Sequence, residues 1–481
     1  MRNTNWRSLV VVAALLTAGA ARAKAQAQPA ANVRALEPTG ARAEAVAHYE
    51  TGLDANLVGN FAAAARHLRM ALDSDSGFGL ARSELALITG GRPSIAQHDR
   101  AVADAAKGSA GEALMALAQR EGAAGRGANA RAIWDALAQM YPDDRRIALK
   151  RALSRTDTAR LNLLRELARR APEYAPAHAY LAVSLVPSAI LTYDQTVADE
   201  ALAAADAGLR AQPEGASLLG VRGYVAERLL RHDEAMQYLD RSSAAEPIDW
   251  VYYTKAEIAS RDRKVTLARA YLDSAITVSQ SLPRRVGMRV TQALLRVEEG
   301  AIGDAVAGLR SIAQQAETDN LPGAAANAHA VTSFLYAAMG DTAAVGRELA
   351  DAARLGESRA DLAFWRIYAA ALTGMGTTAT EQLAAYVDEA RNPDSGIKPE
   401  YVHSATGLAA LANGKYEEAI AHLKQGGADP ENELATIEAL TKLGRKKEAA
   451  AARDSLLARK NMDVSFVEVP VAIYRSTMKR K

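Results

Sequence analysis

The 481-residue sequence contains no cysteine, which excludes a disulfide framework. Aromatic residues are also scarce, at 5% of the chain. A large globular core usually needs more aromatic and branched bulk than this, whereas an alanine-rich chain suits helices that pack at close range. The composition therefore argues against the three large globular domains that the length alone would suggest.

An excess of charge of one sign is missing as well. The chain has 58 lysines and arginines against 56 aspartates and glutamates, a formal net charge of +2. This balance lacks the excess of basic residues that is typical of nucleic-acid-binding proteins. Charged residues at 24% and hydrophobic residues at 49% are ordinary values for folded proteins, which argues against wholesale disorder.

The first residues have the layout of a cleaved secretory signal. Arg2 and Arg7 precede an apolar run from Leu9 to Ala21, which is shorter than the roughly 20 residues that a helix needs to cross a bilayer. Overlapping small-x-small cleavage sites then run from Ala21 to Ala27. No later stretch approaches membrane-spanning length without interruption by charge.

We therefore expect residues 1–25 to be a signal peptide and residues 26–44 a linker. The mature chain is expected to be exported to the periplasm or beyond, soluble, and not a lipoprotein, because no cysteine follows the apolar run. Cleavage would leave 54 basic residues against 56 acidic ones, because it removes Arg2, Arg7, Arg22 and Lys24.

A pattern of small and large residues recurs along the rest of the chain. In the clearest copy it consists of Ala235, Leu239 and Ser242, followed by Pro247. Offsets of four and seven return to one helix face, so these residues form a small, large, small stripe against which a neighbouring helix packs closely. Further copies place the first residue of the stripe at Ala64, Ala96, Ala130, Ala201, Ala268, Ala305, Val345, Leu383, Ala419 and Ala449.

Each stripe is expected to belong to the second helix of a pair. A small residue stands twelve positions before several stripes and would be the matching contact on the first helix: Gly52, Ala118, Gly223 and Gly407. Prolines end several second helices, since proline cannot donate the next helical hydrogen bond: Pro142, Pro172, Pro213 and Pro247. A two-helix unit with a period in the low to mid thirties is typical of a helical solenoid.

These residues resemble the tetratricopeptide repeat family, whose motif has small contact residues in both helices and a closing proline over about 34 residues. The resemblance covers residues 45–460 and implies an all-α solenoid, a right-handed superhelix of about ten to twelve repeats. Some units depart from the pattern. Residues 186–195 are expected to insert a loop, the first helix near residues 151–171 looks short, and units beginning near Val286, Ala326 and Gly356 are longer.

The C-terminal residues 461–481 follow the array. Their strand-like alternation and basic end predict either a cap for the last repeat or a disordered basic tail.

No catalytic, cofactor or metal motif emerges. The eight histidines are scattered and make no one-turn pair of the kind that a helical zinc site requires. Two stretches, 125–127 and 374–376, match the start of a dinucleotide fingerprint, but they fall where the repeat places its tight turn. We therefore predict a non-catalytic protein without a cofactor or a metal.

A solenoid of this kind presents a concave surface, built mainly from the first helix of each pair. Placed on the family pattern, the inward-facing candidates for partner binding are Tyr224, Glu227, Trp250, Tyr253 and Glu257. The aromatic residues among them also suit simple packing between repeats.

The resemblance and the missing chemistry predict an exported scaffold of the bacterial envelope that holds a protein or peptide partner in its groove. The alternative is a saccharide-binding or enzyme-accessory role in envelope polysaccharide metabolism, with Trp250 and Tyr253 as a stacking platform. The sequence identifies neither the partner nor the oligomeric state.

Overall fold

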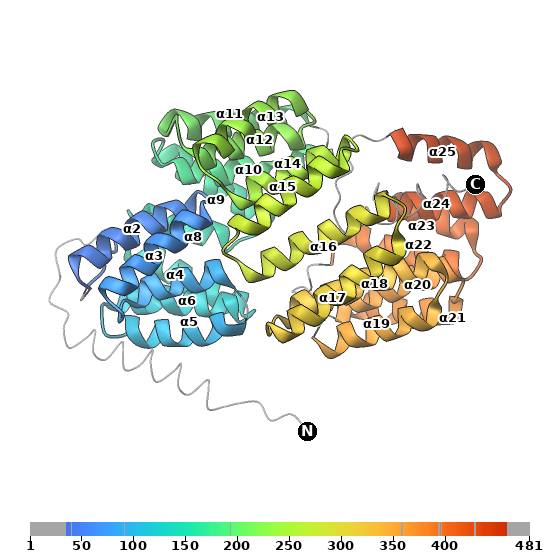
Figure 1. The fold of residues 1–481 in the computed structure, drawn as a ribbon, viewed down its shortest axis with the longest axis horizontal. Helices are drawn as coiled ribbons and strands as arrows, with labels where there is room; N and C mark the ends of the chain where they lie inside the picture. The colour runs from blue at the N-terminus through green and yellow to red at the C-terminus, as the bar shows by residue number, and fades with distance from the viewer. Residues whose placement is uncertain are drawn as a thin grey trace, which may run out of the picture. The chain divides into compact units, whose positions relative to one another are not determined.

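A computed structural model of the chain describes residues 35–458, apart from 40, 91, 193, 357–358, 393–394, 396 and 428–429. Across these residues it has 24 helices and no strand. Consecutive helices follow one another through short turns as helix pairs (Figure 1). The predicted all-α solenoid is confirmed, with twelve pairs in the described part of the chain. The predicted signal peptide and the C-terminal segment 461–481 lie outside the described residues.

The first helices of the pairs are α2 (Ala43–Leu57), α4 (Gly79–Thr89), α6 (Ala110–Ala123), α8 (Arg145–Leu153), α10 (Ala175–Thr192), α12 (Ala216–Arg228), α14 (Asp249–Arg261), α16 (Leu282–Glu298), α18 (Pro322–Met339), α20 (Arg359–Thr373), α22 (Pro399–Ala412) and α24 (Pro430–Lys442). The second helices are α3 (Phe61–Ser74), α5 (Arg92–Ala105), α7 (Gly127–Met140), α9 (Asp157–Arg170), α11 (Gln195–Ala211), α13 (His232–Ala245), α15 (Val265–Val278), α17 (Ile302–Thr318), α19 (Thr342–Arg354), α21 (Gly376–Ala390), α23 (Tyr416–Gln425) and α25 (Lys446–Ala458).

The chain divides into two compact units, which meet in sequence between Val225 and Ala226, inside α12. In some repeats of each unit a first helix contacts its own second helix and also the next first helix, as α4 contacts α5 and α6 and as α20 contacts α21 and α22. None of the described helices is both long and apolar enough to cross a membrane.

The predicted small contacts allow the two helices of a pair to approach closely. Ala235, Leu239 and Ser242 of α13 are fully buried, as the stripe requires. In the first pair, a Cβ added to Gly52 of α2 would lie 2.9 Å from the Cγ of Leu68 on α3. A side chain at residue 52 would therefore push the helices apart.

In most pairs, the turn between the two helices has the same backbone conformation and the same hydrogen bond. The first helix is followed by a glycine with positive φ, and the next residue donates its N–H to the carbonyl five positions back, as Lys415 does to Ala410 over 3.0 Å. This is the Schellman helix end, which favours glycine because glycine has no Cβ to clash. Both Gly-x-Gly stretches singled out in the sequence, at 125–127 and 374–376, are such turns.

Two predicted contact positions are wrong. Ala96 is exposed, and the buried face of α5 consists instead of His98, Ala101 and Ala105. Gly79 of α4 sets this register, since a Cβ there would stand 2.4 Å from the backbone nitrogen of Ala105.

In α21 the first residue of the stripe is the fully buried Ala379. Leu383 is half-buried and takes the middle position, followed by buried Tyr386. The prediction was therefore displaced by four residues, one helical turn, because Leu383 lies on the same face as Ala379.

The loop predicted at 186–195 is also wrong, because α10 continues through Pro187 to Thr192. A proline inside a helix costs about 3 kcal/mol. Pro187 itself is exposed, whereas Leu185, Val186 and Ala189 on either side of it are buried. Burial of these apolar residues favours helix over loop. The first helix near residue 151, α8, is short as expected, at nine residues.

The N-terminal boundary of the array lies slightly earlier than predicted, because α2 begins at Ala43. Of the predicted linker 26–44, the described residues 35–39 are packed against the first repeats, with Leu36 only 5% exposed.

Candidate functional site

The first helices α2, α4, α6 and α8 of the first unit are joined by one buried carboxylate. Glu84 on α4 is fully buried and accepts hydrogen bonds from Asn56 of α2 over 2.7 Å and from Lys150 of α8 over 3.1 Å. Gln119 of α6 also donates to it. Four first helices therefore converge on Glu84, and its buried charge is compensated by one cation and two amide donors.

A second buried carboxylate, Asp144, stands at the start of α8. Its Oδ1 accepts the backbone N–H groups of Arg146 at 2.9 Å and Ile147 at 3.1 Å, which caps the helix. Its Oδ2 accepts a different donor, the backbone N–H of Leu36, over 3.0 Å. Asp144 thus binds helix α8 with one oxygen and a distant backbone segment with the other.

Residues 35–39 lie against the first helices α6 and α8, and Leu36 is the most buried residue of this segment. The Nη2 of Arg146 donates to the carbonyl of Leu36 over 3.1 Å, so both backbone groups of that residue are bound. The Leu36 side chain borders a small cavity of about 10 Å³ that is also lined by the apolar residues Tyr49, Leu80, Met115 and Ile147. The segment combines backbone recognition with one buried side chain, as a bound peptide does.

The other end of the segment is held by Glu112 of α6. The Oε2 of Glu112 accepts the Thr39 hydroxyl at 2.5 Å and the Thr39 backbone N–H at 3.1 Å. The same carboxylate completes a capping box with Ser109 at the start of α6. Glu112 therefore resembles Asp144 in serving both a helix terminus and the segment.

A cleft of about 590 Å³ adjoins this segment at Ala35. Its walls come from α2, α8 and α9 and are strongly charged, with Glu50, Asp54, Asp143, Asp144, Glu173, Arg145, Arg146 and Arg170 among the lining residues. Burial raises the pKa of the Asp54 carboxyl, although the guanidinium groups of Arg146 and Arg145 oppose the shift. Polar walls of both signs suit the backbone and charged side chains of a peptide.

The two predicted groove carboxylates lie in ion pairs in the second unit. Glu227 is fully buried, with its Oε1 2.5 Å from the Nη2 of Arg261 and its Oε2 3.1 Å from the Nε of Arg228. Glu257 is 6% exposed and pairs with the Nη2 of Arg228 over 2.7 Å. The fold thus brings Glu227 and Glu257 together through Arg228.

The three predicted groove aromatics are all half-buried. Tyr253 of α14 packs against the apolar cluster formed with α15 and α16, and its hydroxyl lies 3.3 Å from the Oγ1 of Thr291. Tyr224 lies on α12 and Trp250 in the first turn of α14. A partner-binding role for these five residues remains a prediction.

The fold pairs histidines that the sequence scan treated as scattered. The Nδ1 atoms of His403 and His422 lie 3.0 Å apart, and those of His48 and His67 lie 3.5 Å apart. Each pair spans 19 residues and places one histidine four positions before the contact glycine of the first helix. That spacing, read against the repeat, would have revealed the pairs. Among the described residues, no group of three or more His, Cys, Asp or Glu side chains is arranged to hold a metal.

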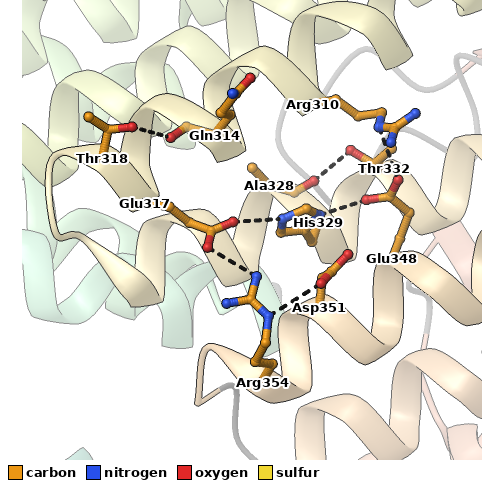
Figure 2. Close-up of polar contacts among 10 residues, drawn as sticks. All are labelled: Arg310, Gln314, Glu317, Thr318, Ala328, His329, Thr332, Glu348, Asp351 and Arg354. Carbon is orange, nitrogen blue, oxygen red and sulfur yellow. Dashed lines mark hydrogen bonds and ion pairs between the residues drawn. The ribbon is translucent and has the colours of Figure 1, made fainter.

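A third polar pair, shown in Figure 2, has the same spacing of 19 residues in another helix pair. His329 of α18 and Glu348 of α19 are buried, and the Nδ1 of His329 lies 2.6 Å from the Glu348 Oε2. Glu317 lies 3.6 Å from the opposite ring nitrogen. Burial lowers the pKa of His329, but the hydrogen bond and charge of Glu348, together with Asp351 and Glu317, outweigh it, so the net pKa is raised.

The sequence reasoning missed the segment at 35–39 and its ligands, Asp144, Arg146 and Glu112. An aspartate before a helix signals a cap, which Asp144 is, but Leu36 and Asp144 are 108 residues apart. No periodicity or motif links such positions.

The helix pairs, the glycine and alanine contacts between their helices and the repeated glycine turn reproduce the architecture that the sequence pattern predicted. The described part of the chain is an α-solenoid of helix pairs, the fold that the resemblance to tetratricopeptide repeats implied. No family model matches it, and no curated protein does.

Several solved repeat structures are similar to this chain. A thermophilic tetratricopeptide repeat protein of Thermus thermophilus is 21% identical over 39% of this chain and 99% of its own, with a TM-score of 0.35. Yeast Tom70 is 14% identical over 85% of this chain and 96% of its own, with a TM-score of 0.42. A human IFIT1 dimer with PPP-AAAA is 13% identical over 84% and 94%, with a TM-score of 0.42.

Proposed function

We propose that this protein is an exported, non-catalytic scaffold that binds an extended peptide segment of a partner protein on the inner face of α2, α4, α6 and α8. The observation that carries the proposal is the binding of residues 35–39 in this chain, where Asp144 and Arg146 bind the N–H and the C=O of Leu36. We call the site that these residues occupy the peptide seat. Side chains that bind backbone groups accept an extended chain with few demands on its sequence.

Specificity at this seat would come from the buried positions of the peptide. Leu36 is 5% exposed, whereas its neighbour Glu37 is exposed. The alternation matches an extended chain, in which successive side chains face opposite ways. An apolar anchor in a formed pocket usually contributes much of the affinity of such a complex.

The polar groups of the inner face support binding more than catalysis. Glu84 is engaged by three donors, and Asp144 and Glu112 each cap a helix. A general base must reach a substrate proton with a free lone pair, and these carboxylates are committed to structural donors.

Export is supported by the sequence of the first 25 residues: two arginines, a short apolar run and small-residue cleavage sites. Mass spectrometry of the protein purified from its native host tests this part of the proposal. We expect mature N-terminal peptides that begin near residue 26, and an intact peptide that starts at Met1 would contradict cleavage.

The binding proposal is tested with a displayed random-peptide library selected in parallel on the full wild-type chain and on a full-chain Leu36→Ala/Thr39→Ala variant, which weakens the contacts of residues 36–39. Peptides selected on either protein are resynthesised with a photoreactive group and crosslinked to it. We expect crosslinks on α2, α4, α6 and α8. Failure to select any peptide, or crosslinks confined to other helices, would contradict the proposed site.

A further inference from the structure

We propose that residues 36–39 are an internal ligand that competes with the partner, and that the partner segment has the same chemistry: an apolar residue, any residue, proline, then threonine or serine. The inference rests on the proposed function and adds the class of partner and the control of access. In this chain the four positions are Leu36, Glu37, Pro38 and Thr39.

The seat is formed independently of the segment that fills it. The Asp144 Oδ1 is fixed by the N–H groups of Arg146 and Ile147, and only the Oδ2 binds Leu36. Glu112 is fixed by Ser109, from which it accepts a backbone N–H over 2.8 Å. Both carboxylates would therefore keep their positions if the segment left, which is the condition for a second peptide to take its place.

Each of the three specified positions, occupied here by Leu36, Pro38 and Thr39, has a contact that favours its residue type. The anchor enters the pocket that Tyr49, Met115 and Ile147 help to line. Pro38 lines the same small cavity. A hydroxyl at the last position donates to the Glu112 Oε2, as Thr39 does. Proline also restricts the free peptide to extended backbone, which lowers the entropy lost on binding.

Attachment to the chain gives the internal segment an advantage over a free peptide. Only residues 40–42 separate Thr39 from the start of α2 at Ala43. A short tether holds a ligand at an effective concentration on the order of millimolar, so a free peptide of equal intrinsic affinity is largely excluded. A partner would reach the seat by binding more tightly, or when the segment is withdrawn.

The test uses the full chain and a fluorescent peptide with the sequence of residues 33–42. The Leu36→Asp variant would place a carboxylate in an apolar pocket beside buried Asp144, which expels the internal segment. By fluorescence anisotropy we expect this variant to bind the peptide at least tenfold more tightly than the wild type. A peptide with aspartate in place of its leucine should bind neither protein.

A second pair of variants places the peptide in the proposed seat. In the Leu36→Asp background, adding Asp144→Asn should weaken peptide binding at least tenfold, because the amide replaces the charged acceptor of the leucine N–H. The matched control is Asp206→Asn in the same background. Asp206 is paired with Arg222 over 2.7 Å in the first unit and does not line the seat.

The outcomes that overturn the proposal are distinct. Equal peptide binding by folded wild-type and Leu36→Asp proteins would exclude competition. A large loss of helical circular dichroism in both Leu36→Asp and the milder Leu36→Ala/Thr39→Ala variant would show that the segment is an integral part of the fold. Library peptides that bind both proteins equally would refute the competition and leave the proposed function standing.

Discussion

Gly407 of α22 and Leu423 of α23 lie so close that a Cβ on residue 407 would stand 2.7 Å from the Leu423 Cγ and 2.9 Å from the Leu423 backbone nitrogen. A neighbour that includes backbone cannot move aside cheaply, and overpacking of this kind typically costs about 1–3 kcal/mol. We expect Gly407→Ala to lower the free energy of unfolding by that amount, measured by urea denaturation.

The matched control for this substitution is Gly287→Ala. Gly287 lies inside α16, and a Cβ there would meet no atom within 4 Å. Alanine is favoured over glycine in a helix interior by about 0.5–1 kcal/mol, so this variant should be stabilised. Equal effects of the two substitutions would contradict the role assigned to the close contact.

Arg263 occupies the turn position that is glycine in seven other pairs, with a φ of +59°. Left-handed backbone costs a residue with a Cβ roughly 1–2 kcal/mol, and the Arg263 side chain is exposed. We expect Arg263→Gly to raise the free energy of unfolding by about 1 kcal/mol. The reciprocal variant, Gly414→Ala at a φ of +72°, should lower it.

Glu227 should be a large contributor to the stability of the second unit. Its replacement by alanine leaves the side chain of Arg261, which is 6% exposed, without its carboxylate partner. Breaking a buried ion pair in this way costs about 3–5 kcal/mol. Asp388→Ala, which removes a partner from an exposed pair with Arg391, should change stability by under about 0.5 kcal/mol. A small effect of Glu227→Ala in urea denaturation would contradict this assignment.

His329 makes the second unit sensitive to pH. Because the folded pKa is raised above the ordinary value of 6.5, the protonated imidazole is favoured by folding. Its stabilising contribution is fully present below pH 6.5 and is lost as pH rises through the folded pKa. We expect the stability difference between wild type and His329→Gln to be larger at about pH 6 than at about pH 8.5. A difference that grows with pH would reverse the sign assigned here.

The saccharide alternative is tested at Trp250 and Tyr253. Because the proposed peptide seat lies on α2, α4, α6 and α8, we expect a Trp250→Ala/Tyr253→Ala variant to retain the peptides selected on the wild type. We also expect no glycan on an array to be held above background. Glycan binding by the wild type that this variant loses would favour the alternative over the scaffold.

Local rules were sufficient to predict the repeat. Gly52 and Ala64, or Gly407 and Ala419, belong to the same helix pair, so their spacing of twelve is visible in the sequence. The rules failed where several alignments of the repeat fit equally well, as at Ala96, because α5 also offers Ala101, Ala103 and Ala105. They failed again at Pro187, where burial of its neighbours outweighed the local preference of proline.

The candidate site could not be predicted in this way. The ligands of the segment come from α6 and α8, and their common partner lies before the first helix. Asp144 and Glu112 were visible only as ordinary helix-capping residues, because the sequence does not show that a capping carboxylate can accept further hydrogen bonds from a distant segment.

One Asp144 oxygen binds the first turn of α8 and the other binds the peptide, so peptide binding and the order of that turn are thermodynamically coupled. Any ligand that binds the Oδ2 restrains the carboxylate and thereby the N–H groups of Arg146 and Ile147 that bind the Oδ1. Hydrogen exchange at these two amides would then slow as more of the protein has a peptide bound. The exchange rate in helix α8 would therefore measure the bound fraction.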